Sequence, residues 1–90
     1  MKTDLERIAF IKNPDNWQPI CETGRIRTFV LNYKGFDAYR QDVLKEDGEW
    51  HKQFWYRFPP TGQPFKMDQK SFIEYLARID AMKPDMEEKA

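Results

Sequence analysis

Few residues of this sequence are suited to acid–base or metal chemistry, and they lie far apart. His51 is the only histidine and Cys21 the only cysteine. A zinc site would need several carboxylates beside them. A catalytic histidine needs a pocket and an orienting partner, for which Asp42 on a neighbouring strand is the candidate. We interpret His51 as a half-exposed strand residue, and we expect no catalytic residue, no metal ligand, no cofactor and no enzyme activity.

An acidic run holds the next candidates, Glu46, Asp47 and Glu49. Asp47 precedes Gly48, and Asp-Gly is typical of a two-residue hairpin loop with solvated neighbours. The pattern therefore predicts a turn rather than a carboxylate site. Each of the four glycines stands alone in the sequence, so no glycine-rich phosphate loop is present.

The composition indicates a small aromatic-rich domain without net charge. The chain has 90 residues, of which 15 are basic and 15 acidic, so its overall charge attracts neither polyanions nor anionic membranes. Seven Phe, four Tyr and three Trp supply a dense core, which favours a single domain over residues 1–90. No apolar run is long enough to span a bilayer. We expect a monomer or a small homo-oligomer without membrane contact.

The single cysteine bears on both location and chemistry. One cysteine excludes an intramolecular disulfide, which favours a reducing compartment and a cytoplasmic location. Cys21 would be reactive if Arg25 or Arg27 stabilised its thiolate. An isolated cysteine more often acts as a small buried hydrophobe, and this is the role that we expect for Cys21.

Capping and proline signals predict a helix near the start of the chain. Thr3 and Glu6 have the spacing of a capping box, which predicts a helix over about residues 4–12. Residues 13–24 are rich in turn formers and predict an irregular connector. Trp17 lies within this connector and is expected to plug one edge of the core.

The C-terminal third predicts a loop, a helix and a tail. Residues 59–67 form a proline-rich loop, which ends the sheet because proline lacks the ladder donor. A helix over about 69–83 follows, capped by Asp68 or Ser71. Residues 84–90 are expected to form a frayed, charged tail.

Strand-forming residues occupy the middle of the chain. Residues 25–33, 36–44 and 50–58 are rich in aromatic and β-branched side chains, which predicts three strands within 25–58. Lys34-Gly35 and Asp47-Gly48 supply the turns. The fold class is therefore α+β, a three-stranded antiparallel β-meander packed on one face by an N-terminal and a C-terminal helix, in the order α-β-β-β-α.

Two-residue turns predict a strand register and, through it, two sheet faces. Phe29 is then opposite Arg40, which is opposite Trp55. We expect the helices to pack on the other face, which carries Ile26, Thr28, Val30, Tyr39, Gln41, Val43, Lys52, Phe54 and Tyr56. On the face left open to solvent, the candidate binding residues are Arg27, Phe29, Arg40, His51, Gln53, Trp55 and Arg57. A register slip of one residue would exchange the faces of a whole strand.

Three functional hypotheses follow from this face. The first is a protein–protein interaction module or inhibitor that uses the open face or an edge strand, because Trp, Tyr and Arg dominate binding hot spots. The second is single-stranded nucleic-acid binding, in which aromatic rings stack on bases and arginines meet phosphates. A net charge of zero speaks against it. The third is a purely structural cation–π stack of Phe29, Arg40 and Trp55 that serves no ligand.

Overall fold

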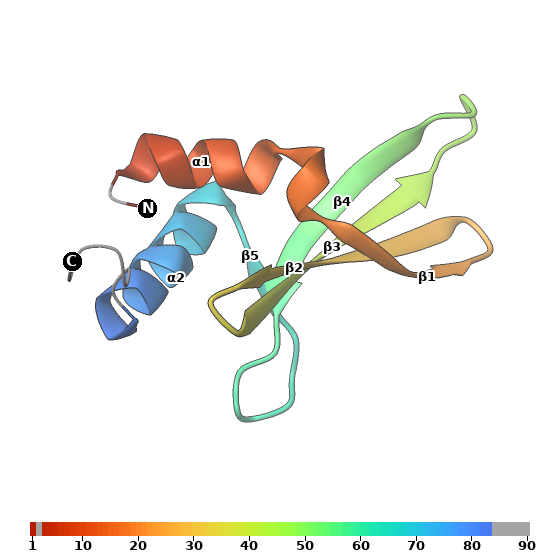
Figure 1. Cartoon of the computed structure of the whole chain (residues 1–90). Helices are drawn as coiled ribbons and strands as arrows, with labels where there is room; N and C mark the ends of the chain where they lie inside the picture. Colours follow the sequence, from red (N-terminus) through yellow and green to blue (C-terminus); the bar gives the residue numbers. More distant parts are fainter. Residues whose placement is uncertain (2, 84–90) are drawn as a thin grey trace.

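The computed structural model describes residue 1 and residues 3–83, which form two helices and a five-stranded antiparallel sheet (Figure 1). The elements in chain order are α1 (Asp4–Lys12), the 3₁₀ helix η1 (Pro14–Asn16), β1 (Gln18–Thr23), β2 (Ile26–Tyr33), β3 (Phe36–Leu44), β4 (Trp50–Arg57), β5 (Phe65–Met67) and α2 (Gln69–Met82). The strands are ordered β1-β2-β3-β4-β5. The predicted α+β class with two helices and an antiparallel sheet is confirmed. The predicted number of three strands is wrong.

Both helices begin at the caps that the sequence predicts. The Thr3 hydroxyl accepts a hydrogen bond from the Glu6 amide at 3.1 Å, and the Glu6 carboxylate accepts one from the Thr3 amide at 3.0 Å. This reciprocal pair satisfies two backbone donors that a helix N-terminus otherwise leaves unpaired. The Asp68 carboxylate caps α2 by accepting from the Ser71 amide at 2.7 Å. The tail expected over 84–90 lies outside the described residues.

The two unpredicted strands lie in segments that were expected to be irregular. β1 occupies the second half of the 13–24 connector and pairs with β2, with a register shift between Pro19 and Cys21. All six residues of β1 are exposed, so the strand has no alternation of apolar and polar residues that would reveal it. β5 lies in the loop expected over 59–67 and pairs Met67 with Trp55. Three residues are too few to give a periodic pattern.

The β2–β3 hairpin has the predicted register. Lys34 and Gly35 both have positive φ angles, 51° and 89°, as a two-residue turn of this twist requires. Gly35 adopts this angle without strain because it has no Cβ atom. As a result Phe29 pairs with Arg40.

The β3–β4 hairpin differs from the prediction close to its turn. Leu44 pairs with Trp50, so the loop covers residues 45–49 rather than Asp47-Gly48 alone. A register shift at Gln53 then restores the predicted pairing of Arg40 with Trp55. Because a bulge inserts one residue into a strand, the residues before it change faces. Trp50 and Lys52 therefore share the face of Trp55, and His51 lies on the opposite face.

The helices pack on the face that was expected to be open. Leu31, Ala38 and Trp55 project from this face and are buried, with 1%, 1% and 7% of their surface exposed. They contact a buried stripe on α2 formed by Phe72, Leu76 and Ile79. The other buried hydrophobic residues of the core are Ile11, Trp17 and Met67. The expected core position of Trp17 is confirmed, and its indole Nε1 donates to the Ile11 carbonyl at 2.7 Å.

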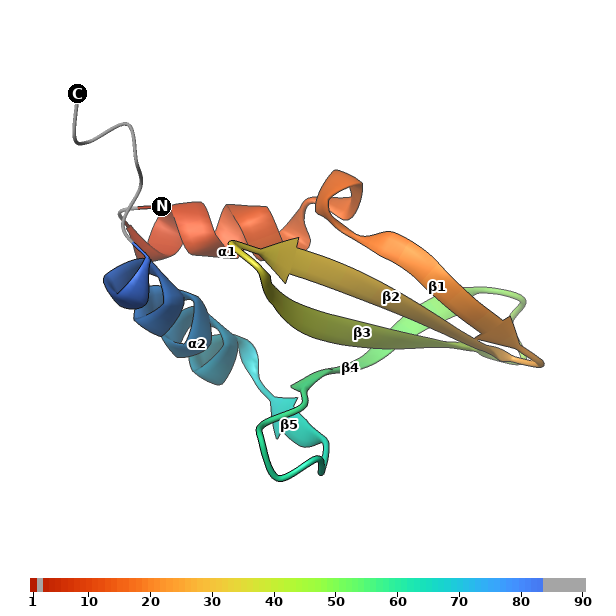
Figure 2. The ribbon, with the colours of Figure 1, turned by 60° about the horizontal axis from the view of Figure 1, so that its bottom comes forward.

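This face differs in composition along its length, which explains the wrong assignment. α1 and α2 lie at one end of the sheet, and the β1–β2 and β3–β4 hairpins extend past them (Figures 1 and 2). Apolar residues occupy the end under the helices. Arg27, Asp42 and Lys52 lie further along the strands. Lys52 is exposed and Arg27 partly exposed, whereas Asp42 is buried in an ion pair with Arg40. In the sequence, the apolar residues of one end and the charged residues of the other are counted together, so the face has a mixed composition that does not predict a helix-covered surface.

We call this face the helix face and its opposite the open face. The helix face carries Arg27, Phe29, Leu31, Ala38, Arg40, Asp42, Leu44, Trp50, Lys52, Trp55, Arg57, Phe65 and Met67. The open face carries Ile26, Thr28, Val30, Tyr39, Gln41, Val43, His51, Phe54, Tyr56 and Lys66. None of these open-face residues is buried by the part of the chain that the structure describes.

A polar cluster ties both helices to the β2–β3 turn. The Asp80 carboxylate on α2 accepts hydrogen bonds from the Tyr33 hydroxyl, from Lys34 Nζ at 3.0 Å and from Arg7 Nη2 at 3.0 Å. Arg7 lies on α1, so one carboxylate joins three separate elements. Desolvation alone would raise the pKa of Asp80, but these hydrogen bonds outweigh it and the pKa is lowered.

Candidate binding surfaces of the sheet

The residues proposed from the sequence do not form one open surface. Trp55 is part of the core, with its ring centroid 5.4 Å from that of Phe72 in an edge-to-face contact. Gln53 and His51 are exposed, but Gln53 is at the bulge and His51 lies on the open face. Only the partly buried residues Arg27, Phe29, Arg40 and Arg57 remain together on the helix face.

The Arg40 guanidinium is held by neighbouring side chains of the same chain. It forms an ion pair with Asp42, with Nε 3.0 Å from Oδ1 and Nη2 3.2 Å from Oδ2. Its carbon Cζ lies 4.3 Å from the ring centroid of Phe29 and 5.3 Å from that of Trp17. The predicted contact of Phe29 with Arg40 is therefore confirmed. The cation over Trp55 is Lys52, whose Nζ lies 3.5 Å from the ring centroid.

The other two arginines also contact rings of their own chain. Arg27 Cζ lies 3.8 Å from the Trp50 ring centroid, and its Nε forms an ion pair with Glu22 at 3.0 Å. Arg57 Cζ lies 4.8 Å and 5.1 Å from the rings of Phe65 and Tyr75. Such contacts stabilise a partly exposed cation by about 0.5–1 kcal/mol. The helix-face arginines thus have internal partners.

His51 has an acidic partner, but the partner is Asp47 rather than Asp42. His51 Nε2 lies 3.0 Å from Asp47 Oδ2, and Asp47 Oδ1 accepts from the Glu49 amide at 2.9 Å. The Glu49 amide and His51 lower the pKa of Asp47. The predicted turn role of Asp47 is confirmed, and Gly48 has a positive φ of 82°. Within residues 1 and 3–83, no three His, Cys, Asp or Glu side chains are placed to share a metal ion.

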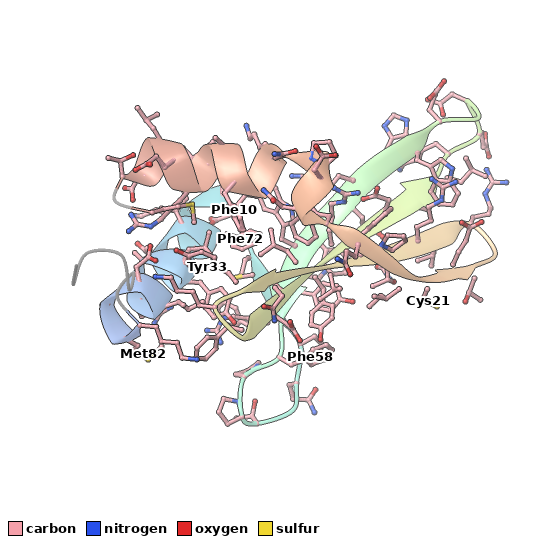
Figure 3. All side chains as sticks on the ribbon, viewed as in Figure 1. Phe10, Cys21, Tyr33, Phe58, Phe72 and Met82 are labelled. Atoms are coloured by element: carbon pink, nitrogen blue, oxygen red, sulfur yellow. The ribbon has the colours of Figure 1, made fainter. Side chains whose placement is uncertain are left out.

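Cys21 is exposed, so the expectation that it is a small buried hydrophobe is wrong. It lies in β1 at the edge of the sheet, far along the strands from the helices (Figure 3). Its Sγ is 3.5 Å from Thr23 Oγ1, and either atom can donate. An exposed thiol at an edge is accessible to reagents.

The open face carries an aromatic cluster, and three of its members, Tyr39, Phe54 and Tyr56, were expected to lie under the helices. We call Tyr39, Phe54, Tyr56 and Phe58 the open-face cluster. Tyr39 and Tyr56 are stacked with ring centroids 5.3 Å apart, and Phe58 meets Tyr39 and Tyr56 edge to face at 5.5 Å and 5.6 Å. Phe58 is 53% exposed. In Figure 3 it lies where β4 runs into the loop before β5, whereas Phe72 lies between the helices and the sheet.

The cluster borders a groove, which we call the aromatic groove. It is lined by Phe54, Tyr56, Phe58, Pro64 and Lys66 and has a volume of about 310 Å³. Lys66 Nζ lies 4.7 Å from the Phe54 ring centroid. Burial and the nearby Tyr39 raise the pKa of Tyr56 above its ordinary value. A tyrosine hydroxyl can both donate and accept a hydrogen bond. The signal in the sequence was the run of alternating aromatics in 50–58, but alternation does not say which face is covered.

No family model matches the sequence, and neither curated proteins nor solved structures yield a match. No helix among the described residues is long and apolar enough to cross a membrane.

Proposed function

We propose that this chain is a non-catalytic protein-binding domain that contacts its partner through the open face of the sheet. The observation that supports the proposal is the open-face cluster, four aromatic side chains on a face that the described helices leave uncovered. Contiguous exposed apolar surface is unfavourable in water and usually marks an interaction site. Tyrosine and other aromatic side chains are enriched among interface hot spots.

Single-stranded nucleic-acid binding remains the second hypothesis, and the distribution of charge speaks against it. Stacking proteins place cations beside their aromatic platform to neutralise phosphates. Here Arg27, Arg40 and Arg57 lie on the helix face and contact rings of their own chain. In the aromatic groove, Lys66 is the one lining residue with a formal positive charge. The open face therefore suits an apolar polypeptide better than a polyanion.

Selection from a displayed random-peptide library tests this proposal without a known partner. Phe58→Ser removes an open-face ring, and Phe65→Ser removes a ring of similar exposure, 47% against 53%, on the opposite face. We expect selected peptides to bind the wild type and Phe65→Ser within about twofold, and Phe58→Ser at least about tenfold more weakly, the effect of one hot-spot residue. Enrichment of no peptide, or equal binding to both variants, would contradict the proposal.

An oligonucleotide titration separates the two hypotheses. We expect flat fluorescence anisotropy for labelled 15-nucleotide single strands at low salt. Binding that weakens steeply as salt rises, and that is lost in Phe58→Ser, would contradict the protein-binding proposal and support nucleic-acid binding instead.

A further inference from the structure

We propose that the aromatic groove binds proline-rich peptide segments in the polyproline II conformation, with an acidic residue next to Lys66. This inference rests on the proposed function, because it names the chemistry of the partner segment that the open face binds.

The walls of the groove are ring faces at steep angles to one another. The Phe54 and Tyr56 rings are 5.3 Å apart at 49°, and the Tyr56 and Phe58 rings are 5.6 Å apart at 83°. Pro64 adds a further ring to the lining. Such walls form a trough rather than a flat platform, and a volume of about 310 Å³ is small even for a ligand pocket. A slim segment with compact rings fits this trough, whereas an amphipathic helix needs a wider groove.

The polar side-chain groups of the groove are mainly hydrogen-bond donors. They are the Tyr56 hydroxyl and the Lys66 ammonium, and an ammonium cannot accept. An ordinary peptide would bring backbone N–H groups into a site where only the Tyr56 hydroxyl among the lining side chains can accept. Each buried N–H left unpaired costs about 1–3 kcal/mol. Proline has no N–H, and a polyproline II segment presents carbonyl acceptors that match the donors.

The positive charge of Lys66 favours a ligand with an acidic residue beside its proline-rich segment. Lys66 is exposed and rests over the Phe54 ring, and no carboxylate of residues 1 and 3–83 forms an ion pair with it. A carboxylate on the ligand can therefore pair with Lys66 without displacing an existing partner. An exposed pair of this kind contributes little affinity, so the rings supply most of the binding and Lys66 supplies the preference.

Fluorescence anisotropy with defined peptides tests the inference on the full chain. The probes are labelled Glu-Glu-(Pro)₆ and (Pro)₆-Glu-Glu, since a polyproline II segment can bind in either direction. Their matched controls replace Glu with Lys, or replace the prolines with alternating Gly and Ala. We expect at least one acidic proline probe to bind at least about tenfold more tightly than the Gly-Ala probe, because unpaired N–H groups are avoided. Equal binding of both would overturn the inference.

Variants show whether the binding occurs in the groove. Phe58→Ser should weaken the best probe at least about tenfold, as expected for a hot-spot ring, and Phe65→Ser should change its affinity less than about twofold. Lys66→Ala should leave proline binding but remove the preference for Glu over Lys. Thermal unfolding checks that each variant is folded. If Phe58→Ser is not folded, the loss of the Glu preference in Lys66→Ala serves as the readout. Unchanged affinity in folded Phe58→Ser, together with an unchanged preference for Glu over Lys in Lys66→Ala, would contradict the site.

The failures of the two proposals are distinguishable. If library-selected peptides without proline bind through Phe58, the protein-binding function stands and the proline inference is wrong. If neither library nor proline peptides bind, both fail. A dimer that Phe58→Ser dissociates would assign the groove to a second copy of the chain. Proline binding that appears only after deletion of residues 84–90 would assign the groove to the chain's own C-terminal residues.

Discussion

Trp55 and Phe54 are neighbours in β4, yet they serve opposite faces of the sheet. The Trp55 indole packs against the Phe72 ring at 5.4 Å under the helices, whereas the Phe54 ring lies on the open face, 5.3 Å from Tyr56. Alternation along a strand requires this separation. The two residues therefore form a matched pair for testing which face is the core.

Trp55→Ala should lower the free energy of unfolding by about 3–5 kcal/mol, because it leaves a cavity beside Phe72. Phe54→Ala removes a half-exposed ring and should cost about 1–2 kcal/mol. Urea unfolding followed by far-ultraviolet circular dichroism measures both. Equal losses, or a larger loss for Phe54→Ala, would mean that the core lies on the open face.

Asp80→Asn should destabilise the protein at neutral pH by about 2–4 kcal/mol, because it weakens the hydrogen bonds from Arg7, Tyr33 and Lys34. The pKa of Asp80 is lowered from 3.8 in the folded state. A lowered pKa stabilises the fold above the unfolded value, and the contribution disappears as pH falls through the folded value. The difference between wild type and variant should therefore shrink on acidification below about pH 4. Urea midpoints at pH 7, 5 and 3 test this, and a difference that does not change with pH would contradict it.

Tyr33 should titrate last among the four tyrosines. Burial and the hydrogen bond to Asp80 raise the pKa of Tyr33 from 10.0 to about 12. Because the folded pKa is the higher one, this stabilisation is complete below pH 10 and is lost as pH rises through about 12. Tyrosinate absorbance near 295 nm should show a final step near pH 12 that is missing in Tyr33→Phe. An unchanged final step in Tyr33→Phe would exclude this role.

Cys21 should react with a thiol reagent in the native state at nearly the rate of the unfolded chain, within about threefold, because the side chain is exposed. Ellman's reagent with and without urea measures the two rates. Cys21→Ser provides the blank. Protection by a factor of a hundred or more in the native state would show that Cys21 is covered.

Local signals predicted the parts of the fold that depend on neighbouring residues. The capping box of Thr3 and Glu6, the Asp68 cap and the Lys34-Gly35 turn each act within about four residues, so they can be recognised in the sequence alone. β1 and β5 were missed because they are strands only through pairing with β2 and β4. The bulge at Gln53 has no residue signature, and it moves His51 to the open face.

The sequence predicted a binding face that carries aromatic residues, but it predicted the wrong face of the sheet. Aromatic residues alternating along 50–58 indicated a strand with two different faces. The binding face was expected on the side of Trp55, but the helices cover that side at one end. The open-face residues Tyr39, Phe54 and Tyr56 were expected under the helices because the opposite face, with three arginines, is the more polar of the two.

The α+β class, the two helices with their caps and the pairing of Phe29 with Arg40 follow from short-range backbone chemistry, so they can be predicted without the structure. The identity of the buried sheet face depends instead on long-range packing. The α2 stripe of Phe72, Leu76 and Ile79 packs on the sheet face that offers it apolar side chains, and these side chains are distant in the sequence. Leu31, Ala38 and Trp55 supply such partners at one end of a face whose other end is charged. The aromatic side chains left on the opposite face are the surface on which the proposed function rests.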